Sequence, residues 1–90
     1  METTWDPAKA RANLARHGVA FEDAEVALSD PASLTREDPD AEGEARFVTV
    51  GADALGRIVA VVHAHRGDDV RLISARPATR NEKEAYAQGI

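Results

Sequence analysis

The sequence predicts an α+β fold: two N-terminal helices, a twisted antiparallel β-sheet meander and a C-terminal helix. Apolar residues recur at helical spacing in the first 30 positions, whereas β-branched residues dominate from position 46 to 75. A helix-capping pattern follows near the C-terminus. Ninety residues fit one domain, 1–90.

Signals at both ends predict the first helix over Pro7–His17. Asp6 can cap it, and proline is favoured at a first helical position because its missing N–H would have no partner there. Gly18 can adopt the left-handed conformation that ends helices. A short edge strand, Thr3–Trp5, is expected before this helix.

A shorter second helix is predicted after Gly18. Phe21, Ala24 and Leu28 fall at i, i+3 and i+7, which gives an apolar stripe ending before Asp30. The final helix is predicted by Thr79 and Glu82, which have capping-box spacing. It should reach about Gln88.

Valine- and isoleucine-rich segments separated by turn residues predict the sheet. The candidate strands are 34–36, 46–51, 57–66 and 70–75. Short turns join the last three, so these strands form an antiparallel meander. Ile58–Val62 is apolar throughout, which places its strand at the centre of the sheet.

Composition narrows the possible functions. Alanine supplies 18 of the 39 apolar residues, so the core is thin and a binding partner could stabilise it. There is no cysteine, and no segment resembles a signal peptide or a membrane span, so we expect a cytoplasmic protein. The net charge of −5 argues against a broad basic surface that coats nucleic acid.

Charge is distributed unevenly along the chain. Residues 1–44 carry 11 acidic and 4 basic side chains, whereas residues 45–90 carry 5 acidic and 7 basic ones. An anion site should therefore draw mainly on the C-terminal half. The acidic half could be a docking face for a basic partner or simply a solvated surface.

Two sets of polar side chains are candidates for an anion site. Lys9, Asn13 and His17 share one face of the first helix, which is either a solvated face or one turned toward a bound anion. Arg66 and Arg76 are predicted at strand ends near turns, where a guanidinium suits phosphate. The alternative for these arginines is a surface ion pair with a neighbouring carboxylate.

Metal sites are weakly indicated. His63 and His65 project from the same face of a strand, but no third ligand is evident, so structural or surface roles are favoured over metal binding. The acidic segment Glu37–Glu44 lacks the ligand spacing of a calcium loop and is predicted to be a solvated loop.

The order and spacing of many short motifs resemble the BrnT family of type II toxins, from about Trp5 to Tyr86. The motifs are Trp5-Asp6, Lys9, Asn13, His17-Gly18-Val19, Phe21, Asp30-Pro31, Glu44-Ala45-Arg46, Arg66, Ile73-Ser74-Ala75-Arg76, Glu82 and Tyr86. The resemblance implies a RelE-like fold and RNA cleavage without a metal or other cofactor. It also implies a hetero-oligomer with a BrnA-like antitoxin, through which DNA is contacted only indirectly.

Carried over by position, the resemblance implies a site made of six residues: Lys9, His17, Glu44, Arg46, Arg66 and Arg76. Glu44 or His17 could act as the base that takes the 2′-hydroxyl proton. Lys9 and the arginines would hold the phosphate, and His17 or Lys9 could protonate the leaving oxygen.

Two other functions were considered. A catalytically inactive module could retain the antitoxin interface and act as a co-repressor. A regulator that binds DNA directly is disfavoured, because no basic helix or ribbon suited to a groove is evident.

Overall fold

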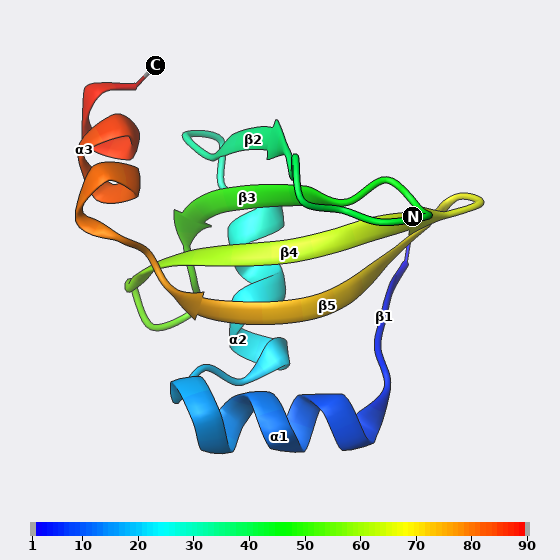
Figure 1. Cartoon of the computed structure of the whole chain (residues 1–90). Coiled ribbons are helices and arrows are strands. Elements are labelled where there is room, and N and C mark those ends of the chain that lie inside the picture. Colours follow the sequence, from blue (N-terminus) through cyan, green and yellow to red (C-terminus); the bar gives the residue numbers. More distant parts are fainter. Residues whose placement is uncertain (1, 90) are drawn as a thin grey trace.

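The structure is a computed structural model and describes residues 2–89 (Figure 1). Its elements, in chain order, are β1 (Thr3–Thr4), α1 (Pro7–His17), α2 (Phe21–Ala24), the 3₁₀ helix η1 (Glu25–Ser29), β2 (Leu34–Glu37), β3 (Phe47–Ala52), β4 (Ile58–Arg66), β5 (Asp69–Pro77) and α3 (Arg80–Gln88). None of the helices within residues 2–89 is long and apolar enough to cross a membrane.

The five strands form one sheet in the order β1-β5-β4-β3-β2. Strands β2 to β5 pair antiparallel, which confirms the predicted meander. The predicted N-terminal edge strand is present but is parallel to β5, with Thr3 opposite Val70 and Thr4 opposite Arg71. The sheet is therefore mixed at this edge.

Local capping chemistry forms α1 and α3 as predicted. The Asp6 carboxylate accepts the Ala8 N–H at 2.9 Å, and Gly18 has a φ of 72° after the last turn of α1. Thr79 and Glu82 form the reciprocal capping box at the start of α3. The helices thus begin and end where short-range signals indicated.

The predicted second helix is divided. Only Phe21–Ala24 is α-helical, and the chain continues as the 3₁₀ helix η1. The η1 backbone lies directly against β3, since a Cβ added to Gly51 would be 2.8 Å from the Ala27 carbonyl oxygen. This packing of backbone on backbone requires glycine at position 51.

The sheet has two unequally covered faces (Figure 1). Figure 1 shows α1 along the β5 edge, α2 behind the central strands and α3 beside one end of the sheet. On the first face, Val59 and Val61 pack with Phe21 in the larger core. On the second, Ala60 and Val50 form a smaller core that α3 covers only in part. We call this second side the open face.

A β-bulge decides which β5 side chains reach the open face. His63 pairs with Leu72 and Val62 pairs with Ser74, so Ile73 is an extra residue in β5. Before the bulge, even-numbered residues of β5 face the larger core, and after it odd-numbered residues do. Arg71 and Arg76, five positions apart, therefore both lie on the open face.

Candidate active site

Positive charge is concentrated on the open face of this acidic protein. Strand register and alternation place five of the nine arginines there: Arg36, Arg46, Arg66, Arg71 and Arg76. Glu44 and Glu82 pair with three of them, which leaves Arg46 and Arg71 without an ion pair among residues 2–89.

Glu44 and Arg66 are brought together as the resemblance implied. Their side chains form an ion pair of 3.3 Å (Nε to Oε2), with 39% and 54% of the respective side chains exposed. An ion pair this exposed is weak and can rearrange around a ligand. A carboxylate and a guanidinium are thus available at the same point on the sheet.

Arg46 lies beside this pair and is only two residues from Glu44. Its Nε atom is buried without a hydrogen-bond partner. Among residues 2–89, Arg46 forms no ion pair. A guanidinium with one unbonded buried nitrogen and no ion-pair partner is a favourable place for an anion.

Arg71 also belongs to this group, although it is not one of the six residues implied by the resemblance. It pairs with Ala64, and Arg46 is expected on the other side of Ala64 because Phe47 pairs with His63. Ala64, between them, is 0% exposed. Recognising Arg71 from the sequence would have required the bulge in β5.

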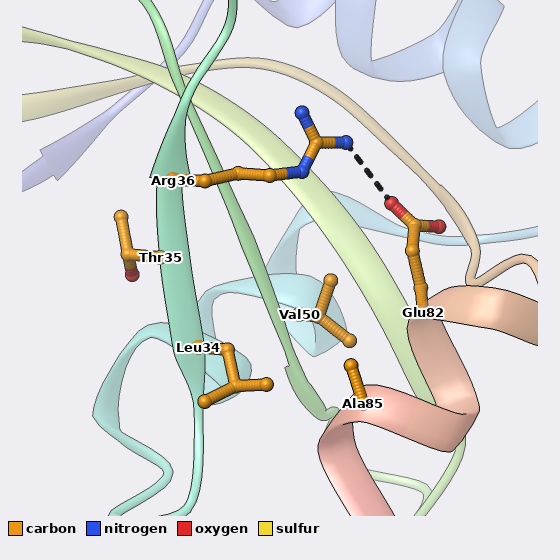
Figure 2. A pocket seen from close by; sticks show the side chains of 6 residues that line it. All are labelled: Leu34, Thr35, Arg36, Val50, Glu82 and Ala85. Atoms are coloured by element: carbon orange, nitrogen blue, oxygen red, sulfur yellow. Dashed lines mark hydrogen bonds and ion pairs between the residues drawn. The ribbon is translucent and has the colours of Figure 1, made fainter. Parts of the chain in front are cut away.

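Arg76 is engaged by a carboxylate. It donates to both oxygens of Glu82, at 2.7 and 3.1 Å. Figure 2 shows Arg36, which donates to the same carboxylate at 3.3 Å. The bonds between Arg76 and Glu82 raise the pKa of Arg76, against the effect of its burial. Chiefly through the Arg76 hydrogen bond, the pKa of Glu82 falls to about 2.

Arg66 and Arg76 are not brought together. Arg76 pairs with Ala60, six positions before Arg66 on β4. At about 3.3 Å per residue, the two backbone positions are roughly 20 Å apart. The C-terminal ends of neighbouring antiparallel strands lie at opposite ends of the sheet along the strand direction. Arg66 and Arg76 are both near the C-terminal end of a strand, and they are therefore far apart.

Lys9 and His17 line a hollow whose walls include neither Glu44 nor Arg66. This hollow of about 190 Å³ lies between α1 and β5, and Ser74 also lines it. Asn13, which separates them on α1, is buried: its amide donates to the Ala75 carbonyl at 2.8 Å and accepts the Ala75 N–H at 3.0 Å. The face of α1 predicted to be solvated or anion-binding is therefore partly a structural contact.

His63 has a structural environment. It is 5% exposed, and its Nε2 lies 2.8 Å from the Thr49 hydroxyl. Burial, and secondarily the charge of His65, lower the pKa of His63. Within residues 2–89, no group of three histidines, cysteines or carboxylates is arranged to hold a metal ion.

A larger hollow of about 400 Å³ lies between β2 and α3 (Figure 2). Its walls include Leu34, Val50 and Ala85, with the Arg36–Glu82 ion pair at one side. Figure 2 shows Thr35 on the opposite side of β2 from Leu34. This hollow is mostly apolar and contains none of the six residues implied by the resemblance.

Comparison with known proteins agrees with the fold. A profile of the family described as "Ribonuclease toxin, BrnT, of type II toxin-antitoxin system" matches residues 5–82. The crystal structure of the Brucella abortus ribonuclease toxin BrnT is similar, with a TM-score of 0.65 and 29% identity. The match covers 89% of this chain and 99% of that one. No curated protein sequence matches. The chain belongs to the BrnT family of ribonuclease toxins of type II toxin-antitoxin systems.

Proposed function

We propose that this protein cleaves RNA on the open face of its sheet, using side chains alone. The observation that carries the proposal is the Glu44–Arg66 contact of 3.3 Å beside Arg46 and Arg71. It combines a proton acceptor with positive charge, the two requirements of RNA transesterification.

In the proposed reaction, Glu44 takes the proton from a ribose 2′-hydroxyl. The 2′-oxygen then attacks the adjacent phosphorus, and the bond from phosphorus to the 5′-oxygen breaks. The products are a 2′,3′-cyclic phosphate and a 5′-hydroxyl, which receives a proton from a general acid. Arg46 and Arg66 would stabilise the charge that develops on the phosphoryl oxygens.

His17 is the alternative base, and His17 or Lys9 is the candidate acid. Both line the hollow between α1 and β5, which neither Glu44 nor Arg66 lines. The two candidate bases therefore belong to different parts of the open face and its rim. A single substitution at Glu44 or at His17 can therefore show which of the two acts as the base.

Arg76 retains a proposed role in phosphate binding, but its guanidinium is hydrogen-bonded to Glu82. It would have to leave that carboxylate to bind RNA. Loss of activity on its substitution must be distinguished from loss of α3, which begins at this contact.

A type II system includes a protein antitoxin, so this chain has a protein partner. We propose that the partner is BrnA-like and forms a hetero-oligomer with this chain in the cytoplasm. The complex would contact DNA only through the antitoxin. The inactive co-repressor is the less favoured function, because the matching family is one of ribonucleases.

The test is RNA cleavage by wild type, Glu44→Gln and His17→Ala, with folding checked by circular dichroism. Loss of a general base should lower kcat about 10²- to 10⁴-fold. We expect that loss for Glu44→Gln, no inhibition by EDTA, and a 2′,3′-cyclic phosphate in the products. Glu84→Gln, an exposed acid on α3, is the matched control.

A larger loss for His17→Ala than for Glu44→Gln would assign the base to His17. Intact RNA with the wild-type protein, together with normal growth of cells expressing it without antitoxin, would refute the proposed activity.

A further inference from the structure

A hollow of about 290 Å³ lies beside the Glu44–Arg66 pair. It is lined by Thr4, Trp5, Asp6, Arg66 and Arg71. Arg66 thus contributes both to this hollow and to the ion pair with Glu44. Any group bound in the hollow would lie next to the proposed catalytic carboxylate.

Trp5 provides a fixed aromatic wall. Its indole packs edge-on against the buried Phe21, with ring centroids 5.8 Å apart and an interplanar angle of 78°. Thr4 pairs with Arg71, and Trp5, the next residue, lines the same hollow as Arg71. The indole is half-buried, so part of it remains available to a ligand.

The charges of the hollow favour an anion. Arg66 and Arg71 line the hollow with Asp6, and because Arg66 is paired with Glu44, Arg71 is the positive charge left for an anion. The Asp6 carboxylate accepts the Ala8 N–H at the start of α1. Arg71 forms no ion pair with any residue in the range 2–89.

We propose that this hollow binds one nucleotide of single-stranded RNA adjacent to the cleaved bond. The base would stack on Trp5, and its phosphate would receive hydrogen bonds from Arg71. Aromatic rings and guanidinium groups are the usual platforms for unpaired RNA bases, whereas arginine binds phosphate in bidentate geometry. The inference rests on the proposed function, because it assigns the hollow to the same substrate.

The chain offers a direct reporter, since Trp5 is its only tryptophan. The probe is a ten-nucleotide 2′-O-methyl RNA, which lacks the nucleophilic hydroxyl and cannot be cleaved by transesterification. We expect saturable quenching of Trp5 fluorescence in wild type.

For Arg71→Ala, we expect the Kd to rise about 10-fold or more. One phosphate contact fewer should also reduce the slope of log Kd against log salt by about 0.7. Arg80→Ala, which removes an exposed arginine of α3, is the control and should bind like wild type. Arg71→Lys keeps the positive charge but lacks the planar guanidinium, so its Kd should lie between those of wild type and Arg71→Ala.

Two results would overturn the assignment: unchanged Trp5 emission on RNA binding, or equal affinity and salt slope for Arg71→Ala and wild type. Quenching by the antitoxin but not by RNA would also overturn it. Trp5→Phe, measured by cleavage of ordinary RNA, should raise KM more than it lowers kcat. An unchanged KM contradicts the stacking role.

The subsite and the activity can fail separately. Quenching that needs Arg71, in a protein that never cleaves RNA, would support the subsite and refute the proposed function. RNA cleavage by a protein whose Trp5 fluorescence is unchanged by RNA would support the proposed function and refute the subsite.

Discussion

Glu82 is the residue on which the contacts around α3 converge. Its carboxylate accepts from Arg76, from Arg36 and from the Thr79 N–H, and its side chain is 12% exposed. One side chain thus ties α3 both to β5 and to β2. Replacing it affects the seating of a whole helix.

Glu82 should make stability depend on pH. Its pKa is lowered from the ordinary value of 4.5 to about 2, so its charge stabilises the fold above pH 4.5. This contribution is lost as the pH falls from 4.5 to 2. Urea unfolding at pH 6 should show Glu82→Gln destabilised by roughly 1–3 kcal/mol, with the difference shrinking toward pH 2. Glu84→Gln, the control, should change little, and a pH-independent difference for Glu82→Gln would contradict the argument.

His63 should make the stability of the protein depend on pH in a higher range than Glu82 does. Burial lowers the pKa of this imidazole below its ordinary value of 6.5, so the folded state binds the proton less readily than the unfolded chain. Stability should fall as the pH drops from 6.5 through the folded-state pKa. His63→Gln, whose amide can still bond to Thr49, should lose that part of the pH dependence in denaturant titrations. His65→Gln is the comparison, and equal pH dependence in His63→Gln and wild type would show that His63 does not titrate in this way.

At the level of elements, the seam between η1 and β3 depends on a missing side chain. Gly51→Ala should destabilise the protein by about 1–3 kcal/mol, because the added methyl group would meet the Ala27 carbonyl oxygen at 2.8 Å. Thermal unfolding measures this. Ala52→Ser, one position along the same strand, is the control. A Gly51→Ala protein as stable as wild type would mean that η1 can move away from the sheet at little cost.

Helix α3 is attached differently from α1. None of its residues is fully buried, and its main fixed points are the Glu82 contacts and the Tyr86 hydroxyl, which donates to Asp30 at 2.6 Å. This bond lowers the pKa of Asp30 and raises that of Tyr86. The C-terminal helix is therefore held mainly by polar contacts at its two ends.

For the whole molecule, the sequence predicts most elements because their signals are local. Asp6, Pro7 and Gly18 bound α1, and the Thr79/Glu82 capping box starts α3. The meander follows from apolar runs and short turns. Such signals depend on a few neighbouring residues, and no long-range pairing is needed to recognise them.

The arrangement of the site could not be predicted so fully, because it depends on register. The distance between Arg66 and Arg76 follows from the pairing of Arg76 with Ala60, at the other end of β4 from Arg66. The open-face position of Arg71 follows from the bulge at Ile73. The buried role of Asn13 depends on Ala75, 62 residues away. Of the six residues that the resemblance implied, Glu44 and Arg66 are in contact and Arg46 lines a hollow with Glu44.

The thin core predicts a strong effect of the antitoxin on stability. A partner that binds only the folded state, present at a free concentration of about 100 times its Kd, adds roughly 2.7 kcal/mol to the free energy of unfolding. For a domain of this size that corresponds to a rise in Tm of roughly 10–20 °C, measurable by calorimetry. A Tm independent of antitoxin concentration would contradict binding selective for the folded toxin.

The Asn13 amide also bears on aggregation. Strand β1 covers β5 only at Val70 and Arg71, and Asn13 occupies both backbone groups of Ala75 further along the same edge. A side chain from a helix thus takes the place of a neighbouring strand. Asn13 precedes β5 by many residues in the chain, so this contact can form as soon as β5 joins the sheet, and it then blocks pairing of this part of the edge with another chain. Asn13 thus protects this part of the edge from pairing with a second chain, and it also links α1 to the sheet.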